Sequence, residues 1–387
     1  YRKARLVPAH KRLALKTLEQ GDYQLPECQL DHLRRLTDGT GILHHATHCV
    51  PDFSGGYRTI DNAFALRLAV LLEETGDDAP DPAALASTYA AFIGHAFQPD
   101  TASFHDHLSF DHRWLGDGES DEILGAAAWA LGTCIGRSRT PGLQRWAAQL
   151  FERTLPAIAR TTTPRACALG LLGIHEYFRR LSGDRVAEDA REILTQRLLD
   201  LFRQHERAGW TWFEPALGYA NAWLPHALIL AGRWNARHDA LDTGLRSLRW
   251  LLARQTAPSG DFRPTDAGAP SLAGSPARLD QKPSEAAATV AACIEAHAAT
   301  RDPLWVDEAR RAFEWFLGRN ELGESLYDPT TGGCCDALHV DRLNLNQGAE
   351  STLAFLLALQ EMRLLDTALH AESPEVGPLT EPLPAAS

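Results

Sequence analysis

The stretch that decides the fold is EILGAAAWALG, residues 122–132. Apart from its first glutamate, its side chains are small or apolar, so a helix built from it can be approached closely by neighbouring helices on several sides. Five further stretches share this character, and each follows a cluster of polar or aromatic residues. They begin near Asp61, Ala166, Asn221, Glu285 and Gly348. Successive starts are 44 to 64 residues apart, which leaves room for two helices and their connections.

Helix patterns of a second kind lie between these stretches and carry Arg, Glu and Asp on one face. They run near 82–97, 141–159, 184–205, 236–254 and 303–318. Half-polar helices suit an outer layer that faces water, whereas the small-residue helices suit an inner layer. A helix near 8–19 or 26–37 would close the outer set at six. The alternation predicts an all-α protein with an (α/α)6 toroid fold, six inner and six outer helices, in one domain over residues 1–370.

Two other arrangements are open for the same pattern, an irregular helical bundle and a solenoid whose ends do not meet. Strand signals are nearly absent, because β-branched alternation over four or more residues is hard to find. The Pro- and Ala-rich tail, residues 371–387, is predicted to be disordered.

Composition excludes several classes of partner. The chain has 387 residues with 38 basic and 50 acidic side chains, a net charge of −12, and no basic tract. These features argue against nucleic acid as the main partner. No apolar stretch reaches the roughly 18–20 residues of a membrane-spanning helix. The seven cysteines are odd in number and scattered, which is typical of a reduced compartment, so we expect a cytoplasmic protein.

The place to look for chemistry is the set of clusters that precede the inner helices. Inner helices of a toroid run parallel, so their N-terminal ends meet on one face and present free N–H groups and a partial positive potential. These clusters are rich in the side chains that recognise sugars. Aromatic rings stack on the apolar faces of pyranoses, and amides and acids bind hydroxyl groups.

The cluster GWTWFEPALGYANAWLPHA, residues 209–227, is the most informative of these. Its single carboxylate, Glu214, lies among aromatic residues that include Trp212 and Tyr219. Such surroundings would raise the pKa of the carboxyl group, as a general acid near neutral pH requires. The alternative is an aromatic core in which Glu214 pairs with an arginine.

Two more acids begin inner helices and are candidates for a catalytic base. Asp61 follows FSGGYRTI (53–60), and Glu122 follows the acid-rich segment 117–121. Each is also the kind of residue that caps a helix or occupies its first turn. The predicted sugar contacts, with Trp114, Trp212 and Tyr219 as stacking platforms, are Tyr57, Arg58, Asn62, Trp114, Trp212, Tyr219, Asn221, Gln281, Asn346, Gln347 and Glu350.

Two histidine-rich segments, HHATH (44–48) and HDH…DH (105–112), contain residues that could bind a metal. Neither has the fixed helical spacing of convergent ligands, so we interpret both as solvated loops.

Several motifs together resemble a known family. They are LDHLRRLTDGTGILHHATHCVPD (30–52), GYRTIDNAFAL (56–66), WFEPALGYANAWLPHALILAG (212–232), FEWFLGRNELG…LYDPTTGGCCDAL (313–338) and LNLNQGAESTLAFLLAL (343–359). These motifs resemble the glycosidase-like toroid domains of bacteria that are often fused behind family-4-type retaining glycosyltransferases. The resemblance covers about residues 26–367 and implies the toroid fold and an association with carbohydrate. The sequence departs from the family pattern at Ile60 and Ala220, where the family has acids.

We therefore expect an enzyme, a glycoside hydrolase that acts on an oligosaccharide or glycan. Many enzymes of this architecture invert the anomeric configuration, so that analogy favours inversion. Glu214 is the predicted acid and Asp61 or Glu122 the predicted base, and no metal or organic cofactor is required.

Three alternatives stay open. The first is a non-catalytic glycan-binding module that serves a glycosyltransferase domain or neighbour. The second is a sugar epimerase on the same fold, which needs histidines near the mouth of the toroid, where His226 and His339 are the nearby candidates. The third is a purely structural helical scaffold.

Overall fold

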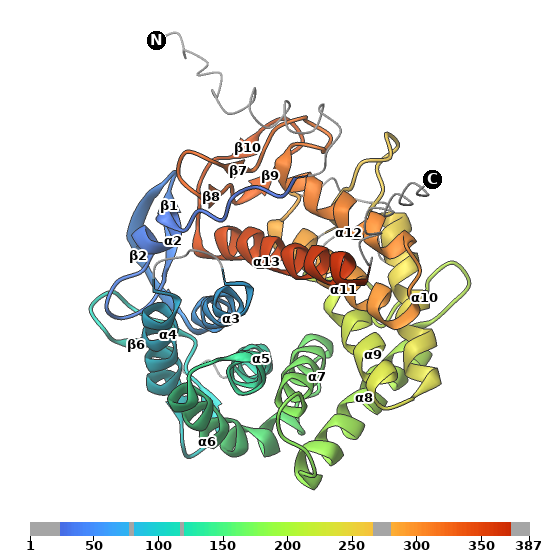
Figure 1. Ribbon diagram of the computed structural model, residues 1–387, viewed down its shortest axis with the longest axis horizontal. Coiled ribbons are helices and arrows are strands. Elements are labelled where there is room, and N and C mark those ends of the chain that lie inside the picture. Colours follow the sequence, from blue (N-terminus) through green and yellow to red (C-terminus); the bar gives the residue numbers. More distant parts are fainter. Residues whose placement is uncertain (1–23, 77–80, 117–119, 266–279, 373–387) are drawn as a thin grey trace, which may run out of the picture.

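The computed structural model describes residues 24–76, 81–116, 120–265 and 280–372. Within these residues, six helices form an inner ring: α3 (Thr59–Thr75), α5 (Asp121–Arg137), α7 (Pro164–Phe178), α9 (Trp223–Trp234), α11 (Pro283–Thr300) and α13 (Ala349–Glu372). Each contacts the next, and α13 contacts α3, so the ring closes (Figure 1). This closure confirms the predicted (α/α)6 toroid and excludes the open solenoid.

Every inner helix has an outer partner. The outer helices are α4 (Pro82–Ala96), α6 (Pro141–Ile158), α8 (Arg185–His205), α10 (His238–Arg254) and α12 (Leu304–Glu314), which the short helix η1 (Trp315–Leu317) continues. They pack on α3, α5, α7, α9 and α11 in that order, and the short α2 (Asp31–Leu36) packs on α13 in the sixth place. The other candidate for that place, near 8–19, lies outside the described residues, as does the predicted disordered tail from residue 373 on. The prediction is wrong for the first two residues of the tail, 371 and 372, which belong to α13.

Small residues let the inner helices touch backbone to backbone. At Gly132 on α5, an added Cβ would lie 2.1 Å from the carbonyl oxygen of Gly173 on α7. At Gly173, it would lie 2.5 Å from the carbonyl oxygen of Ala128. Larger side chains at these positions would push the two helices apart, so the composition of the quoted stretch sets the diameter of the ring.

Short strands occupy the connections, which differs from the expectation of almost no strand. β1 (Leu43–Thr47), β2 (Val50–Arg58), β5 (His107–Leu108) and β6 (Trp114–Leu115) form a four-stranded antiparallel sheet in the order β1-β2-β5-β6. Two-stranded pairs join β3 (Phe97–Gln98) to β4 (Ser103–Phe104), β7 (Tyr327–Asp328) to β8 (Gly333–Cys334) and β9 (Ala337–Leu338) to β10 (Leu343–Asn344). These strands escape a search for β-branched alternation because most are two residues long and the longest pair is rich in His, Gly and Pro.

Several strands lead directly into inner helices, and so they set the position of the helix starts. β2 ends at Arg58, immediately before α3, and β10 precedes α13 by a few residues. One hydrophobic cluster fills the space between the inner and outer layers. Among the described residues, no helix combines the length and the apolarity that crossing a membrane requires.

Candidate active site

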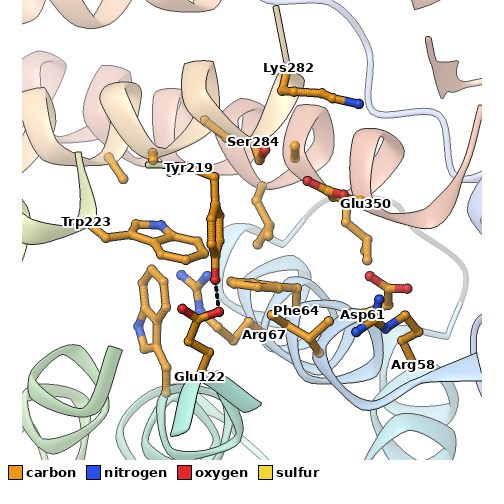
Figure 2. Close-up of a pocket in the computed structure, with 18 of the residues that line it drawn as sticks. Arg58, Asp61, Phe64, Arg67, Glu122, Tyr219, Trp223, Lys282, Ser284 and Glu350 are labelled. Carbon is orange, nitrogen blue, oxygen red and sulfur yellow. Dashed lines mark hydrogen bonds between the residues drawn. The ribbon is translucent and has the colours of Figure 1, made fainter. Parts of the chain in front are cut away.

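A cavity of about 370 Å³ runs into the inner ring from the end where the inner helices begin (Figure 2). Its upper lining comes from the first turns of α3, α5, α11 and α13, and its deeper lining from later turns of the same four helices. On α13 the lining extends from Glu350 to Glu361, which at the helical rise of 1.5 Å per residue is about 16 Å. The inner helices therefore form the walls of a deep pocket with polar groups at both ends.

At the mouth, Asp61 and His44 form a hydrogen-bonded pair. Asp61 lies in the first turn of α3 with a nearly buried carboxylate, and its Oδ2 is 2.6 Å from Nδ1 of His44. Because a carboxylate can only accept, Nδ1 of His44 donates. Burial alone would lower the pKa of His44, but the hydrogen bond to Asp61 and the charge of Asp61 together raise it.

The prediction that the histidines of residues 44–48 lie in a solvated loop is wrong for His44. This residue belongs to β1, and its ring lines the cavity. Sequence spacing gave no signal for this, because the pairing joins a strand to a helix that begins more than a dozen residues later.

A third mouth residue, Glu350, lies in the first turn of α13 and points into the cavity. Its side chain is reached by solvent within the cavity, yet protein surrounds it on the other sides. That desolvation, followed by the negative charge of Asp61, raises the pKa of Glu350 even though Ser284 hydrogen-bonds to it and Lys282 opposes the shift. A carboxyl group in these surroundings holds its proton to a higher pH than an ordinary glutamate, as a proton donor needs.

Across the cavity from Asp61 and Glu350, Glu122 pairs with Tyr219 (Figure 2). The phenol hydroxyl of Tyr219 donates to Oε2 of Glu122 in the first turn of α5. Burial and the neighbouring carboxylate raise the pKa of Tyr219, so this phenol stays protonated and keeps donating. The rings of Phe64 and Trp223, stacked 5.7 Å apart, add an aromatic surface to the same lining.

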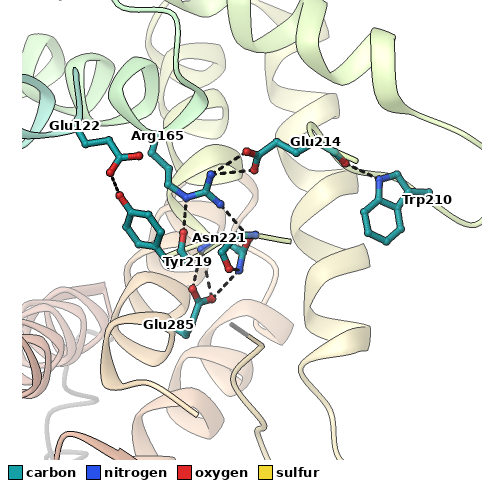
Figure 3. Close-up of polar contacts among 8 residues, drawn as sticks. Glu122, Arg165, Trp210, Glu214, Tyr219, Asn221 and Glu285 are labelled. Atoms are coloured by element: carbon teal, nitrogen blue, oxygen red, sulfur yellow. Dashed lines mark hydrogen bonds and ion pairs between the residues drawn. The ribbon is translucent and has the colours of Figure 1, made fainter. Parts of the chain in front are cut away.

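Arg165 fixes the loop that carries Tyr219 (Figure 3). Its Nε donates to the carbonyl oxygen of Tyr219 at 2.5 Å, and its Nη1 donates to both carboxylate oxygens of Glu214 at 3.0 Å. Its Nη2 donates to Oδ1 of Asn221 at 3.3 Å. A Cβ at position 218 would lie 2.0 Å from Nη2 of Arg165, so a larger residue there would displace the guanidinium from these contacts. The predicted acid Glu214 is therefore bound to an arginine behind the loop and lies outside the cavity lining.

Asn221 is the centre of the same loop and is fully buried. Its backbone N–H and its side-chain amide donate to the carboxylate of Glu285, at distances of 3.1 to 3.3 Å. Glu285 is itself fully buried in the first turn of α11. This amide thus ties the loop before α9 to the neighbouring inner helix and does not reach the cavity.

The structure brings part of the predicted set together. Asp61, Glu122, Arg58, Tyr219 and Glu350 line the cavity. The remaining predicted residues lie outside that lining, where they hold loops or fill the core: Glu214, Tyr57, Asn62, Trp114, Trp212, Asn221, Gln281, Asn346 and Gln347.

The aromatic members of this second group have partners that explain their positions. Trp212 is fully buried and stacks on Trp250, with ring centroids 5.6 Å apart, so its faces are not open to a sugar. Trp114 stacks on His105 at 4.8 Å. Tyr57 is buried and donates to a carboxylate oxygen of Asp38 at 2.5 Å.

The amides of the group serve connections between elements. Asn62 accepts from the backbone N–H of residue 42 at 3.0 Å. Gln281 accepts from the indole N–H of Trp315 at 2.9 Å, and Asn346 accepts from the backbone N–H of residue 48 at 2.9 Å. Gln347 donates to Asp328 at 3.2 Å. Amides near helix starts are as common in loop scaffolds as in sugar sites, and the sequence could not separate the two uses.

The deeper lining was not predicted, and a signal for it exists. Positions three, four, seven and eleven residues after a mouth residue face the same side of a helix. From Asp61 this spacing leads to Phe64, and from Glu350 it leads to Leu353, Leu357 and Glu361, all in the lining.

No protein-family model matches this sequence, and no curated protein matches it significantly. Solved structures with the same fold do exist. The cellobiose 2-epimerase of Bacillus thermoamylovorans superposes with a TM-score of 0.67 at 10% identity, over 92% of this chain and 98% of that one. A D-mannose isomerase superposes with a TM-score of 0.64 at 11% identity, over 93% and 99% of the two chains.

A hydrolase is also among the structural neighbours. An inactive variant of an α-1,6-mannanase from a Salegentibacter species, in complex with α-1,6-mannotriose, superposes with a TM-score of 0.56 at 11% identity, over 92% and 99% of the chains. These superpositions establish the shared (α/α)6 glycosidase-like fold, and at identities this low they establish the fold alone. Function has to be argued from the cavity.

Proposed function

We propose that this protein is a carbohydrate-active enzyme, a glycoside hydrolase whose reaction takes place at the cavity mouth. The observation that carries the proposal is the set of carboxyl groups that three inner helices place around one mouth, Asp61, Glu122 and Glu350, of which Glu350 has a raised pKa. Two carboxyl groups with different protonation states are the usual machinery of glycoside hydrolysis.

Glu350 is the proposed acid and Glu122 the proposed base. The Glu350 carboxyl group donates its proton to the glycosidic oxygen as the bond from that oxygen to the anomeric carbon breaks. A water molecule attacks the anomeric carbon from the opposite side and gives its proton to Glu122. This course inverts the anomeric centre and suits carboxyl groups on opposite sides of the cavity, roughly 6.5–9.5 Å apart in inverting enzymes. Burial and the negative charge of Asp61 help Glu350 to keep its proton, although the charge of His44 opposes them.

A second candidate is a sugar epimerase or isomerase, and His44 favours it. A histidine with a carboxylate partner in a substrate-sized cavity is a suitable base for removing a proton next to a carbonyl group. The structural neighbours that are named as an epimerase and an isomerase add support at the level of fold. In that reaction His44 would take the proton and Glu350 would return one.

The test is a panel of oligosaccharides and reducing sugars incubated with the protein in D2O. Chromatography measures released sugar, and mass spectrometry measures deuterium bound to carbon. The variants are Glu350→Gln and His44→Gln, with Glu188→Gln, an exposed position on α8, as the matched control.

Hydrolysis predicts sugar release without deuterium on carbon, a loss of about 10²–10⁴-fold in Glu350→Gln, and an unchanged rate in Glu188→Gln. Epimerisation or isomerisation predicts deuterium on carbon that depends on His44. Binding of a saccharide with neither product would overturn both enzyme proposals and leave the glycan-binding module that accompanies a glycosyltransferase.

A further inference from the structure

The floor of the cavity holds an arginine whose hydrogen-bonding capacity is unused. Arg67 lies on α3, six residues and therefore about 9 Å beyond Asp61 along the helix axis. Its side chain lines the cavity and is 7% exposed. Among the described residues, its guanidinium donates no hydrogen bond, and its Nε is buried without a partner. Buried donors of this strength are normally satisfied, so this one calls for a ligand.

Two aromatic rings lie against the guanidinium, Phe64 at 5.7 Å and, much closer, Trp129. The Cζ atom of Arg67 is 3.3 Å from the centroid of Trp129 on α5, which is a stacking distance. Stacking occupies the face of the guanidinium and leaves its N–H edge for other contacts. Figure 2 labels Arg67 among the residues that line the cavity.

Glu361 provides an acceptor beside this donor. One of its carboxylate oxygens is 3.9 Å from Nη2 of Arg67, too long for a hydrogen bond, and its side chain is 22% exposed within the lining. An oxygen atom placed about 2.9 Å from both atoms would close this gap. A hydroxyl group meets the requirement, because it accepts from the guanidinium and donates to the carboxylate at once.

The floor ends the cavity. Behind Arg67, Arg137 on α5 binds Glu74 at 2.8 Å and Glu176 at 2.8 Å, so charged side chains of three inner helices fill the axis there. A chain of sugars can enter from the mouth and cannot leave through this end.

The acid beside Arg67 disfavours an acidic ligand. Apart from His44, the lining has three basic side chains, Arg58, Arg67 and Lys282, and five acidic ones, Asp61, Asp106, Glu122, Glu350 and Glu361. The positive charge of Arg67 is itself opposed by its neighbour Glu361. Because Glu350 holds its proton more tightly than an ordinary glutamate, the charges of the whole lining nearly balance, but a carboxylate or phosphate placed beside Arg67 would meet the carboxylate of Glu361 directly.

We propose that Arg67 and Glu361 form an end-recognition subsite, in which hydroxyl groups of the terminal unit of a neutral saccharide bridge the guanidinium and the carboxylate. The subsite rests on the function proposed above and deepens it, since it assigns the substrate class: neutral sugars presented as a chain end.

The test measures binding without turnover, by isothermal titration calorimetry. The probes are methyl glycosides of glucose, mannose and galactose, the linear oligomers cellotriose and mannotriose, sodium glucuronate, and a cyclodextrin, which has no chain end. The variants are Arg67→Leu, Arg67→Lys and Glu361→Gln. Arg249→Leu is the matched control, because Arg249 also stacks on an indole, that of Trp305 at 5.1 Å, and lies outside the cavity lining.

We expect at least one neutral probe to bind, at least tenfold weaker binding in Arg67→Leu, a smaller loss in Arg67→Lys, which keeps the charge, and unchanged affinity in Arg249→Leu. Glu361→Gln keeps an acceptor and should bind within about threefold of the parent protein. Thermal melts identify any variant that fails to fold, and if Arg67→Leu does so, the loss of affinity in Arg67→Lys decides.

The proposal is overturned if no neutral probe binds, if glucuronate or cyclodextrin binds more tightly than the linear neutral probes, or if Arg67→Leu and Arg67→Lys bind like the parent protein. Binding that depends on Arg67 with no product in the D2O assay would sustain the subsite and reject the enzyme. If the parent protein turns a saccharide over and both Arg67 variants bind the probes like the parent protein, the enzyme proposal stands and the subsite is rejected.

Discussion

The substitution Glu214→Gln separates a catalytic from a structural role for the carboxylate that the sequence singles out. In the structure both Glu214 oxygens accept from one nitrogen of Arg165 at 3.0 Å, with the two side chains 21% and 6% exposed. Glutamine keeps one acceptor oxygen but removes the charge that balances a nearly buried guanidinium. Hydrogen bonds to charged groups contribute about 1.5–3 kcal/mol, so we expect the free energy of unfolding to fall by about 2 kcal/mol.

The same substitution should have little effect on turnover. Arg165 keeps its hydrogen bonds to the carbonyl oxygen of Tyr219 and to Asn221, so the Tyr219 hydroxyl stays on Glu122. We expect kcat within about threefold of the parent protein, a change of less than 1 kcal/mol in the barrier. Urea denaturation measures the first quantity, and initial rates on the saccharide identified by the panel measure the second.

Two results would refute this reasoning. A loss of turnover of a hundredfold or more with unchanged stability would mean that Glu214 touches the substrate. Unchanged stability together with unchanged turnover would mean that the Arg165 contact contributes nothing. Glu188→Gln, which removes an exposed carboxylate, controls for the general effect of losing one negative charge.

Three other predictions concern the framework. Gly132→Ala places a methyl group 2.1 Å from a carbonyl oxygen and should cost about 3 kcal/mol in urea denaturation, whereas Gly142→Ala, with no atom within 4 Å, should change stability by less than 1 kcal/mol; equal effects would contradict close packing as the cause. Burial alone would raise the pKa of Glu176, but the charge of Arg137 and its two hydrogen bonds hold this pKa at about 2, below the ordinary 4.5. The ion pair therefore stabilises the fold fully above pH 4.5, and the free energy of unfolding should fall by about 3 kcal/mol as the pH falls towards 2. Glu176→Gln should flatten that acid limb of the stability curve, and an unaltered limb would show that other groups cause it. Because the pKa of His44 is raised above its unfolded value of 6.5, the stability that this residue contributes is fully present below pH 6.5 and is lost as the pH rises through the folded pKa. The melting temperature of the parent protein should therefore decrease as the pH rises above 6.5. His44→Gln should remove that decrease in melts recorded from about pH 5 to 9.

The fold could be predicted from the sequence because its cause is local and repeated. Stretches such as 122–132 have small or apolar side chains on all sides, and the intervening helices are polar on one face. Composition alone therefore predicts whether a helix belongs to the inner or the outer layer. The predicted starts near Asp61, Glu122 and Gly348 lie within two residues of the observed ones. Closure of the ring depends on the long-range contact between α13 and α3, which is why the sequence alone left an open solenoid possible.

The sequence predicted a residue of the candidate site only where its position on a helix places it at the cavity mouth. Asp61, Glu122 and Glu350 share one property, a place in the first turn of an inner helix, and all three line the mouth. Glu214 was chosen for its aromatic neighbours, and the partner that fixes it, Arg165, is 49 residues away in the chain. His44 was missed for the same reason, since a hydrogen bond between a strand and a helix leaves no periodic trace in the sequence.

The contact between α13 and α3 also sets the order in which the molecule can be assembled. Asp61 and Glu350 are about 290 residues apart in the chain, yet the charge of one shifts the pKa of the other. Contacts of such long sequence separation carry the largest loop-closure cost and form late. During synthesis the nascent chain can build helix pairs from α3 onward, but the cavity has one wall missing until α13 leaves the ribosome. The cavity mouth is therefore absent from every partial chain, and it forms only when the ring is complete.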